Sequence, residues 1–296
     1  MDNHLPHLSG IVVGVDGSVH STQAATIAAT MAAAEHRTLH LVHAIAPLDA
    51  YYWIRTPAGV GYESPLHKGA SAELTALTHL LREQHPELTV DSHIVLGDAR
   101  DILSDLSEDA HLVVVGTRGR GMFGPSHVGS VALHLTRHAL CPVMVVRPGE
   151  HAPEGNGVVA GIDDTERSLP VLEHAFDAAS RQGASLTILH SDWLLGPVVS
   201  EAGFVPVLDT DEDEVRRLVA EESAGLREKY PDVPVDVVVG HHSAEIELLK
   251  HAEGKDLIVV GARSHGAVGE FLLQSVATQV VQQASCPVVV VPNRRR

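Results

Sequence analysis

The sequence predicts an α/β protein made of two tandem, doubly wound domains, each an open parallel sheet of five strands with helices on both faces. Two observations predict this fold. The 296-residue chain repeats itself once, and within each half short apolar runs alternate with segments of helical spacing. Strands separated by helices indicate βαβ crossovers. Apolar runs without alternation are typical of parallel strands that are buried on both faces.

The internal repeat sets the domain organisation. Residues 11–16 recur as residues 158–163, and residues 111–146 align without a gap on residues 256–291, with sixteen identities in thirty-six positions. Such self-similarity predicts two copies of one structural unit. We expect a first domain over residues 1–148, an exposed linker rich in Pro and Gly over 149–157, and a second domain over 158–296.

The expected elements of the first half follow from their composition. Five segments predict strands, and the fourth and fifth of them are continuous apolar runs. Four further segments predict helices, and a stretch rich in Pro, Gly and aromatic residues predicts a long loop. The strands are expected at 10–15, 39–45, 90–96, 112–115 and 142–146, the helices at 21–36, 66–85, 99–108 and 131–139, and the loop at 47–65.

Composition excludes several classes of protein. The net charge of -17 and an aromatic content of 3% argue against a nucleic-acid partner, which needs a basic face and often stacking aromatic rings. No apolar run reaches the ~18–20 residues that span a membrane. The N-terminus lacks the features of a signal peptide, and the two cysteines, Cys141 and Cys286, form no disulfide framework. We therefore expect a cytoplasmic protein that does not associate with a membrane.

A glycine-rich segment after the fourth strand is the main candidate site. It runs from Gly116 to Ser130 and contains five glycines and the cations Arg118 and Arg120. Glycines admit positive φ and allow close approach to the backbone, and exposed amides form an anion-binding nest. Ser130 is expected to be the N-cap of the next helix, whose N-terminus favours phosphate. The chain's only lysines are Lys68, Lys229, Lys250 and Lys255, so this is no Walker A loop.

Asp16 follows the first strand and has two interpretations of equal weight. Its carboxylate could accept hydrogen bonds from ribose hydroxyls. Alternatively, Asp16 begins a turn and Ser18 caps the first helix. A second ambiguous pair is His134 and His138, spaced i and i+4, which could hold a metal but more simply forms a polar helix face. The identity of any bound metal is not predicted.

The glycine segment resembles a known family. Gly116-x-x-Gly119, nine residues, then Gly129-Ser130 is similar to the G-2x-G-9x-G-[S/T] nucleotide motif of universal stress proteins. Three further segments are similar to that family: the early Val-Gly-Val-Asp at residues 13–16, Val-His-Ala at residues 42–44 and Cys-Pro-Val at residues 141–143. The resemblance covers nearly the whole chain as two copies. It implies strand order 3-2-1-4-5, with ATP between strands one and four.

The same resemblance assigns site residues in the first copy. It implies that Asp16 and Gly116 contact the ribose and that backbone near Gly14 and Val42 frames the adenine. Gly119, Gly129 and Ser130 would hold the phosphates, with a divalent ion such as Mg²⁺. The full set of expected nucleotide-binding residues is Gly14, Asp16, Val42, Gly116, Thr117, Arg118, Gly119, Arg120, Gly121, Gly129, Ser130 and Val131.

The second copy departs from the motif. Ser264 and Gln274 stand where the second and third motif glycines belong, and Glu270 replaces Pro125. A side chain at 264 would penalise a positive φ by about 1–2 kcal/mol if the site requires one. We expect the second site to bind ATP more weakly or not at all. Its candidate residues are Gly161, Asp163, Gly261, Ala262, Arg263, Ser264, His265, Gly266 and Ser275.

Catalysis is not suggested by the first loop. Thr117, Ser126, His127 and Ser130 come without a carboxylate to orient an attacking water, and His127 is more readily a surface loop residue than a general base. We expect an ATP-binding regulatory protein of the stress response with little or no hydrolysis. The alternatives are a slow ATPase or nucleotidyl transferase, and a dimerisation scaffold that binds no nucleotide. The apolar runs 143–146 and 288–291 predict a homodimer. The client protein is not predicted.

Overall fold

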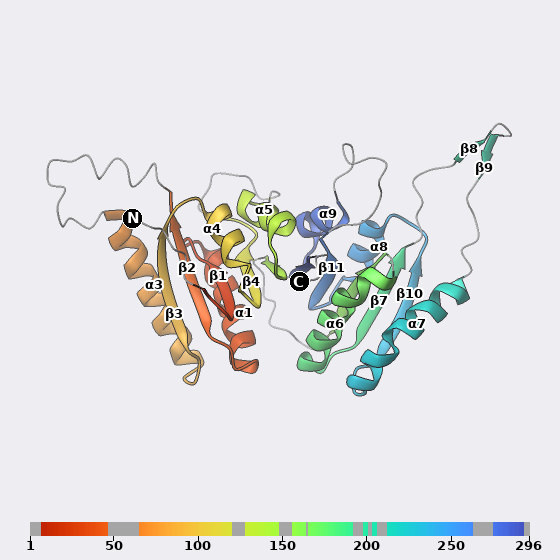
Figure 1. The fold of residues 1–296 in the computed structure, drawn as a ribbon, viewed down its shortest axis with the longest axis horizontal. Helices are drawn as coiled ribbons and strands as arrows, with labels where there is room; N and C mark the ends of the chain where they lie inside the picture. Colours follow the sequence, from red (N-terminus) through yellow and green to blue (C-terminus); the bar gives the residue numbers. More distant parts are fainter. Residues whose placement is uncertain are drawn as a thin grey trace. The chain divides into compact units, whose positions relative to one another are not determined.

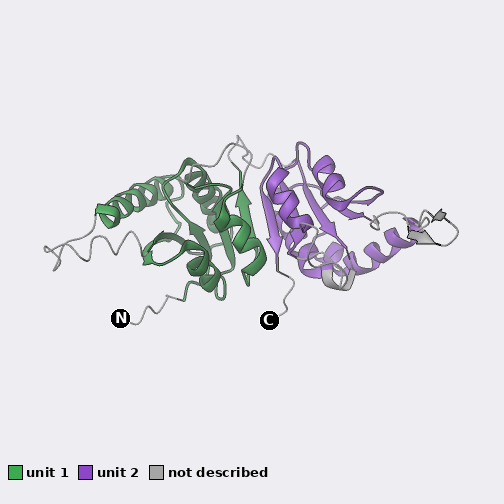
Figure 2. Ribbon diagram, turned by 90° about the horizontal axis from the view of Figure 1, so that it is seen from above, with its two compact units in different colours: residues 1–150, 296 green, residues 151–295 purple. Residues whose placement is uncertain are grey.

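A computed structural model describes most of the chain as two compact units, residues 1–150 and 151–295 (Figure 2). Each unit is considered by itself. The residues described are 7–46, 65–119, 128–147, 156–163, 165–191, 198–200, 203–205, 212–262 and 275–292. The expected linker 149–157, the long loop expected at 47–65 and the central part of each glycine segment lie mostly outside these ranges.

Unit 1 contains a parallel five-stranded sheet with the strand order 3-2-1-4-5 (Figure 1). In space the order is β3-β2-β1-β4-β5, which confirms the predicted α/β fold. The strands are β1 (Ile11–Gly14), β2 (Leu39–Ile45), β3 (Val90–Leu96), β4 (Leu112–Gly116) and β5 (Val143–Val146). The helices are α1 (Val19–Ala34), α3 (Pro65–Gln84), α4 (Ala99–Leu106) and α5 (Ser130–His138).

Unit 2 repeats this topology with the order β10-β7-β6-β11-β12 (Figure 1). An additional antiparallel hairpin, which the sequence did not predict, is formed by β8 and β9. The strands are β6 (Val158–Ile162), β7 (Leu186–Ser191), β8 (Val198–Ser200), β9 (Gly203–Val205), β10 (Val235–Gly240), β11 (Leu257–Gly261) and β12 (Val288–Val291). The helices are α6 (Thr165–Gln182), α7 (Glu212–Lys229), α8 (Ala244–His251) and α9 (Val276–Gln283).

Helices cover both faces of each sheet. In unit 1, α1 and α3 pack together on one face, and α4 and α5 pack together on the other. In unit 2, α6 pairs with α7 and α8 with α9 in the same way. The winding reverses beside β1 and beside β6, because the first crossover goes to one side of the sheet and a later one to the other. A crevice at the carboxyl ends of the strands is expected at each switch point.

The two copies pack their first helices differently. The inner face of α1 is made of alanines that are completely buried, whereas α6 carries larger side chains at three of the five matching positions. Alanine has a small side chain, so it allows a close approach of helix and sheet. The buried residues are Ala24, Ala25, Ala28, Ala29 and Ala32 in α1, and Val171, Leu172, Ala175, Phe176 and Ala179 in α6.

Helix caps refine the expected boundaries. Ser18 is the N-cap of α1, as predicted, and its hydroxyl accepts a hydrogen bond from the Ser21 amide at 3.2 Å. The expectation for Ser130 was wrong, because the N-cap of α5 is Gly129 and Ser130 is the first helical residue.

Cys141 and Cys286 are both buried free thiols. Among the described helices, none combines the length and apolar character that a membrane crossing requires.

Candidate functional site

Unit 1 has a cavity of about 310 Å³ at the carboxyl ends of β1 and β4, where the winding of its sheet reverses. This volume lies at the lower end of the ~300–1,000 Å³ range of ligand pockets. The cavity brings together residues that are far apart in the sequence. They are Gly14, Val15, Asp16, Ser21, Val42, Ala44, Ala99, Leu103, Val115, Gly116, Arg118, Gly119, Gly129, Ser130, Val131 and Ala132.

The inner end of the cavity is apolar and closely packed. Gly14 lies beneath Leu103 of α4, since a Cβ added to Gly14 would stand 2.8 Å from Leu103 Cδ1 and 3.2 Å from Val115 Cγ1. Val42 and Ala44 on β2 add to the apolar lining. An apolar wall with few polar groups suits a flat heterocyclic base. The α4 residues Leu103 and Ala99 were not predicted as site residues, although both lie in the helix expected at 99–108.

Asp16 is held in the turn that leads into α1. One carboxylate oxygen, Oδ1, accepts a hydrogen bond from the Ser18 amide at 3.0 Å, and the Asp16 amide donates to Ser21 Oγ at 3.3 Å. The turn interpretation of Asp16 is thus confirmed. The other oxygen, Oδ2, lies against the Cα of Gly119 and lines the same cavity. Ser18 Oγ also donates to the Arg118 carbonyl at 3.5 Å, which links the two loops.

The described glycines of the loop serve close packing rather than positive φ. Neither Gly116 nor Gly119 has a φ in the left-handed region, and Gly129 has φ -67° and ψ 156°. A Cβ on Gly116 would meet backbone atoms of His20 at 2.8–2.9 Å, and a Cβ on Gly119 would collide with the Asp16 carboxylate. Of the two properties of glycine considered for this loop, Gly116 and Gly119 therefore use close approach and not positive φ.

The N-terminus of α5 opens onto the cavity without a side-chain cap. Gly129 carries no capping side chain, and the first-turn residues Ser130, Val131 and Ala132 all line the cavity. The N–H groups of a first turn have no partner within their own helix, and they carry the positive end of the helix dipole. This geometry favours an anionic group in the cavity.

Not every predicted residue joins the cavity. The Thr117 side chain is buried and does not line it, and the Thr117 backbone is already used: its amide donates to the Val146 carbonyl at 2.8 Å and its carbonyl accepts from the Gly129 amide at 2.7 Å. Thr117 therefore fastens the loop to β5 and to α5. Arg120 and Gly121, with Ser126 and His127, lie outside the described residues.

Positive charge gathers beside the cavity. Burial lowers the pKa of His20, the nearby Arg118 lowers it further, and Asp16 raises it in opposition. Burial also lowers the pKa of Arg147, the residue after β5, and Arg118 adds to this shift. Asp16 and Arg118 line the cavity itself. An anion bound there would relieve the repulsion among these cations.

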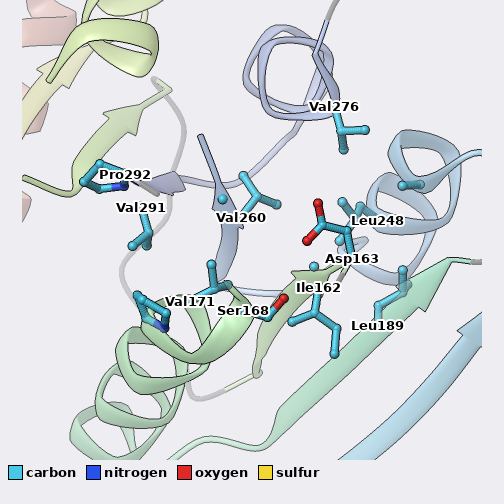
Figure 3. Close-up of a pocket in the computed structure, with 14 residues that line it drawn as sticks. Ile162, Asp163, Ser168, Val171, Leu189, Leu248, Val260, Val276, Val291 and Pro292 are labelled. Atoms are coloured by element: carbon cyan, nitrogen blue, oxygen red, sulfur yellow. The ribbon is translucent and has the colours of Figure 1, made fainter. Parts of the chain in front are cut away.

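The matching pocket of unit 2 is much smaller, about 50 Å³ (Figure 3). Leu189 stands at the position of Val42, and Ile162 stands at the position of Val15. These bulkier side chains narrow the apolar end of the pocket. The Asp163 carboxylate points into the pocket among apolar neighbours, as Figure 3 shows. Of the other candidates, Gly161 and Gly261 line it, Ala262 and Ser275 do not, and residues 263–266 lie outside the described ranges.

The helix N-terminus of unit 2 is also used differently. Ser275 is the N-cap of α9, and its Oγ accepts a hydrogen bond from the Thr278 amide at 3.2 Å. This side chain satisfies one of the N–H groups that α5 leaves open in unit 1. The pocket of unit 2 therefore offers less room and a weaker anion site than that of unit 1.

Metal ligands are not assembled in the part of the chain that the structure describes. No group of three His, Cys, Asp or Glu residues there could hold a metal ion. His134 and His138 stack on one another with ring centroids 4.2 Å apart, and His138 Nδ1 lies 2.9 Å from the His134 carbonyl oxygen. The two histidines thus form a stacked pair on one face of α5.

Comparison with known proteins identifies the family. The sequence model of the universal stress protein family matches residues 9–147 and 156–292. A universal stress protein of Mycolicibacterium smegmatis is 35% identical over 291 residues, covering 96% of this chain and 97% of that protein. One from Mycobacterium tuberculosis H37Rv is 34% identical over 290 residues, covering 95% and 96%.

A solved structure shows the same fold over the whole chain. The crystal structure of a universal stress protein from Archaeoglobus fulgidus superimposes with a TM-score of 0.67 at 16% identity, covering 97% of this chain and 98% of that one. Both halves of the sequence match the family model. The two mycobacterial proteins are identical to this chain at about a third of the aligned positions. The chain therefore belongs to the universal stress protein family, as a tandem-domain member.

Proposed function

We propose that this protein binds ATP in the cavity of unit 1 and acts as a nucleotide-responsive regulatory protein of the stress response. The observation that carries the proposal is the cavity itself. It has an apolar end at Gly14 and Val42, a carboxylate at Asp16, and the uncapped N-terminus of α5 opposite. A base, a ribose and a phosphate chain each find a suitable chemical environment in that order.

Each part of the nucleotide is assigned to residues of this cavity. Gly14 and Val42 frame the adenine, and Asp16 accepts hydrogen bonds from the ribose beside Gly116. Main-chain amides at Gly119 and at residues 130–131 hold the phosphates, since the Gly129 amide already donates to the Thr117 carbonyl. Mg²⁺ would enter with the phosphates, whose oxygens are ligands that this ion prefers.

Hydrolysis is expected to be slow or absent. In the described lining of the cavity, Asp16 is the only carboxylate and there is no histidine. The amide of Ser18 already holds one oxygen of Asp16, so this group is a poor candidate for orienting a water molecule. Nucleotide occupancy can then act as a signal, provided that ATP binds two states of the protein with different affinities.

Unit 2 is proposed to bind ATP weakly or not at all. Its pocket is about 50 Å³ against about 310 Å³ in unit 1, and Ser275 caps the helix that would face the phosphates. The main function of the second copy in this proposal is structural, including a contribution to homodimers. Light scattering after size-exclusion chromatography tests the dimer, and a strict monomer with and without ATP would rule it out.

Isothermal titration of the purified full chain with Mg²⁺ and ATP tests the binding proposal directly. We expect saturable heat and a rise in thermal stability, about 2.7 kcal/mol when ATP is at 100 times its Kd. Phosphate release measured in parallel should stay at background. No heat and no thermal shift would leave a scaffold that binds no nucleotide, whereas rapid phosphate release would indicate an ATPase instead.

A further inference from the structure

Two arginines lie side by side at the carboxyl ends of β4 and β5. Gly116 pairs with Val146 in the parallel register, and the Thr117 amide donates to the Val146 carbonyl at 2.8 Å. Arg118 and Arg147 therefore leave neighbouring strands at the same edge of the sheet. Arg147 is half-buried, and the charge of Arg118 disfavours its protonated form. Two guanidinium groups in this arrangement repel each other, and an anion beside them removes the repulsion.

His20 adds a titratable imidazole to the same edge. Its backbone and Cβ lie against Gly116, and its Nε2 atom is buried without a hydrogen-bond partner. Helix α1, which carries it, packs on β1, β2, β4, β5 and α3. The charged groups that act on His20 are Arg118, which disfavours the imidazolium form, and Asp16, which favours it. Both line the cavity of unit 1.

We infer that His20, Arg118 and Arg147 form one cationic cluster that recognises the phosphate chain of the bound nucleotide by its charge. The cluster makes the site prefer a triphosphate to a monophosphate and bind it more tightly as the pH falls. This inference rests on the proposed binding of ATP in unit 1. It adds Arg147 and His20 to the site, since neither lines the cavity itself.

The direction of the pH dependence follows from the surroundings of His20. In the free protein, burial and Arg118 lower the pKa of His20 and so favour the neutral imidazole. A polyphosphate beside the cluster adds negative charge and favours the imidazolium, so that binding takes up a proton. Affinity then rises as the pH falls toward the pKa of free His20. Each unit by which binding raises this pKa corresponds to about a tenfold limiting gain in affinity.

The second half of the chain supplies a matched variant. The position equivalent to His20 is Arg167, and the position equivalent to Arg147 is Pro292. His20→Arg thus replaces a titratable group by the permanently charged residue type that stands at the equivalent position of the second half. Arg147→Gln removes one charge and keeps a polar side chain of similar length. Arg137→Gln is the control for charge alone, because Arg137 is exposed in the last turn of α5, away from the end that lines the cavity.

The experiment measures the affinity of the full chain and its variants for ATP, ADP, AMP and adenosine. Arg147→Gln should lose about tenfold in ATP affinity, the equivalent of one charge-assisted contact, while the affinity for adenosine stays unchanged. Arg137→Gln should match the wild type for every ligand. Equal losses for ATP and adenosine, or none for either, would overturn the role of Arg147. Thermal melts without ligand identify variants that have simply unfolded.

The pH arm repeats the ATP titrations between about pH 5.5 and pH 8, where an ordinary histidine titrates. In buffers of different ionisation enthalpy, the wild type should take up protons on binding. His20→Arg should bind ATP with a flatter pH profile and a smaller proton uptake. Protonation of ATP itself cancels in this difference, because the ligand is the same. Identical profiles would overturn the role of His20, whereas a wild type that binds no ATP would instead refute the proposed function.

Discussion

The carboxylate of Asp16 lies directly against the Cα of Gly119, one hundred and three residues further along the chain. The contact leaves no space for a side chain at position 119. It also fixes the Asp16 oxygen that the Ser18 amide does not hold. The first motif acid and the second motif glycine are therefore one structural unit, in which the glycine sets the position of the acid.

Gly119→Ala should weaken ATP binding and leave the fold nearly unchanged. The added methyl group displaces the short Asp16 side chain, and the loss of one charge-assisted hydrogen bond costs about 1.5–3 kcal/mol, roughly tenfold or more in Kd. Isothermal titration measures the effect. Gly69→Ala is the matched control, because no atom lies within 4 Å of a Cβ added there. Undiminished affinity in Gly119→Ala would contradict the coupling.

Gly116→Ala should act on stability first. Its added Cβ would stand 2.8 Å from the His20 carbonyl carbon and 2.9 Å from the carbonyl oxygen, and the backbone of α1 cannot move away as a side chain can. Overpacking of this kind costs about 1–3 kcal/mol of unfolding free energy. Urea denaturation of both glycine variants provides the comparison. A Gly116→Ala protein as stable as the wild type would show that α1 shifts freely.

One ATP should bind per chain, and Asp16 rather than Asp163 should control it. Asp16→Asn keeps an acceptor for the Ser18 amide but removes the charge, so we expect about a tenfold or larger loss of affinity for a charge-assisted contact. Asp163→Asn in the small pocket of unit 2 should leave the binding curve unchanged. Isothermal titration measures the number of ATP molecules bound per chain and their affinity. Two ATP sites of equal affinity would refute the prediction that unit 1 alone binds ATP tightly.

Asp98 should stabilise α4 only above acidic pH. It caps the helix by accepting from the Arg100 amide at 2.8 Å, and its side-chain hydrogen bonds with Arg100 lower its pKa from 3.8 to about 2. A depressed carboxyl pKa contributes stability that is present above about 3.8 and lost as the pH falls toward about 2. Loss of the cap in Asp98→Ala should cost about 1 kcal/mol near neutral pH.

The test of this cap is acid unfolding followed by circular dichroism. The difference in stability between wild type and Asp98→Ala should shrink through that window. Asp101→Ala is a suitable control, since Asp101 lies in the first turn of the same helix but is not its N-cap. A constant difference at every pH would show that the charge of Asp98 contributes nothing.

Local patterns were sufficient to predict most of unit 1. The expected strands at 39–45 and 90–96 are β2 and β3 without a change of boundary. β2 is largely buried, whereas β3 has Val90 as its one buried residue and is otherwise half-buried or exposed. Ser18 was recognisable as a cap from its own chemistry and its position before a helix. These features depend on residues that are close in sequence, and so they can be found without the tertiary structure.

The remaining features of the site depend on contacts between distant segments. The reason for glycine at 116 and 119 is the approach of His20 and Asp16, which no local pattern in the loop reveals. The α4 residues Leu103 and Ala99 enter the cavity only because the crossover brings α4 over β1 and β2. Likewise Ser130 looked like a cap by composition, but the chain turns one residue earlier.

The different inner faces of α1 and α6 bear on how a duplicated chain folds correctly. Two copies of one unit in the same polypeptide can exchange elements during folding, which is a known failure of repeat proteins. Phe176 and Leu172 on α6 would not fit a sheet shaped for the alanines of α1, and those alanines would leave voids on the other sheet. The different sizes of the buried side chains on α1 and α6 thus disfavour an exchange of these two helices between the sheets.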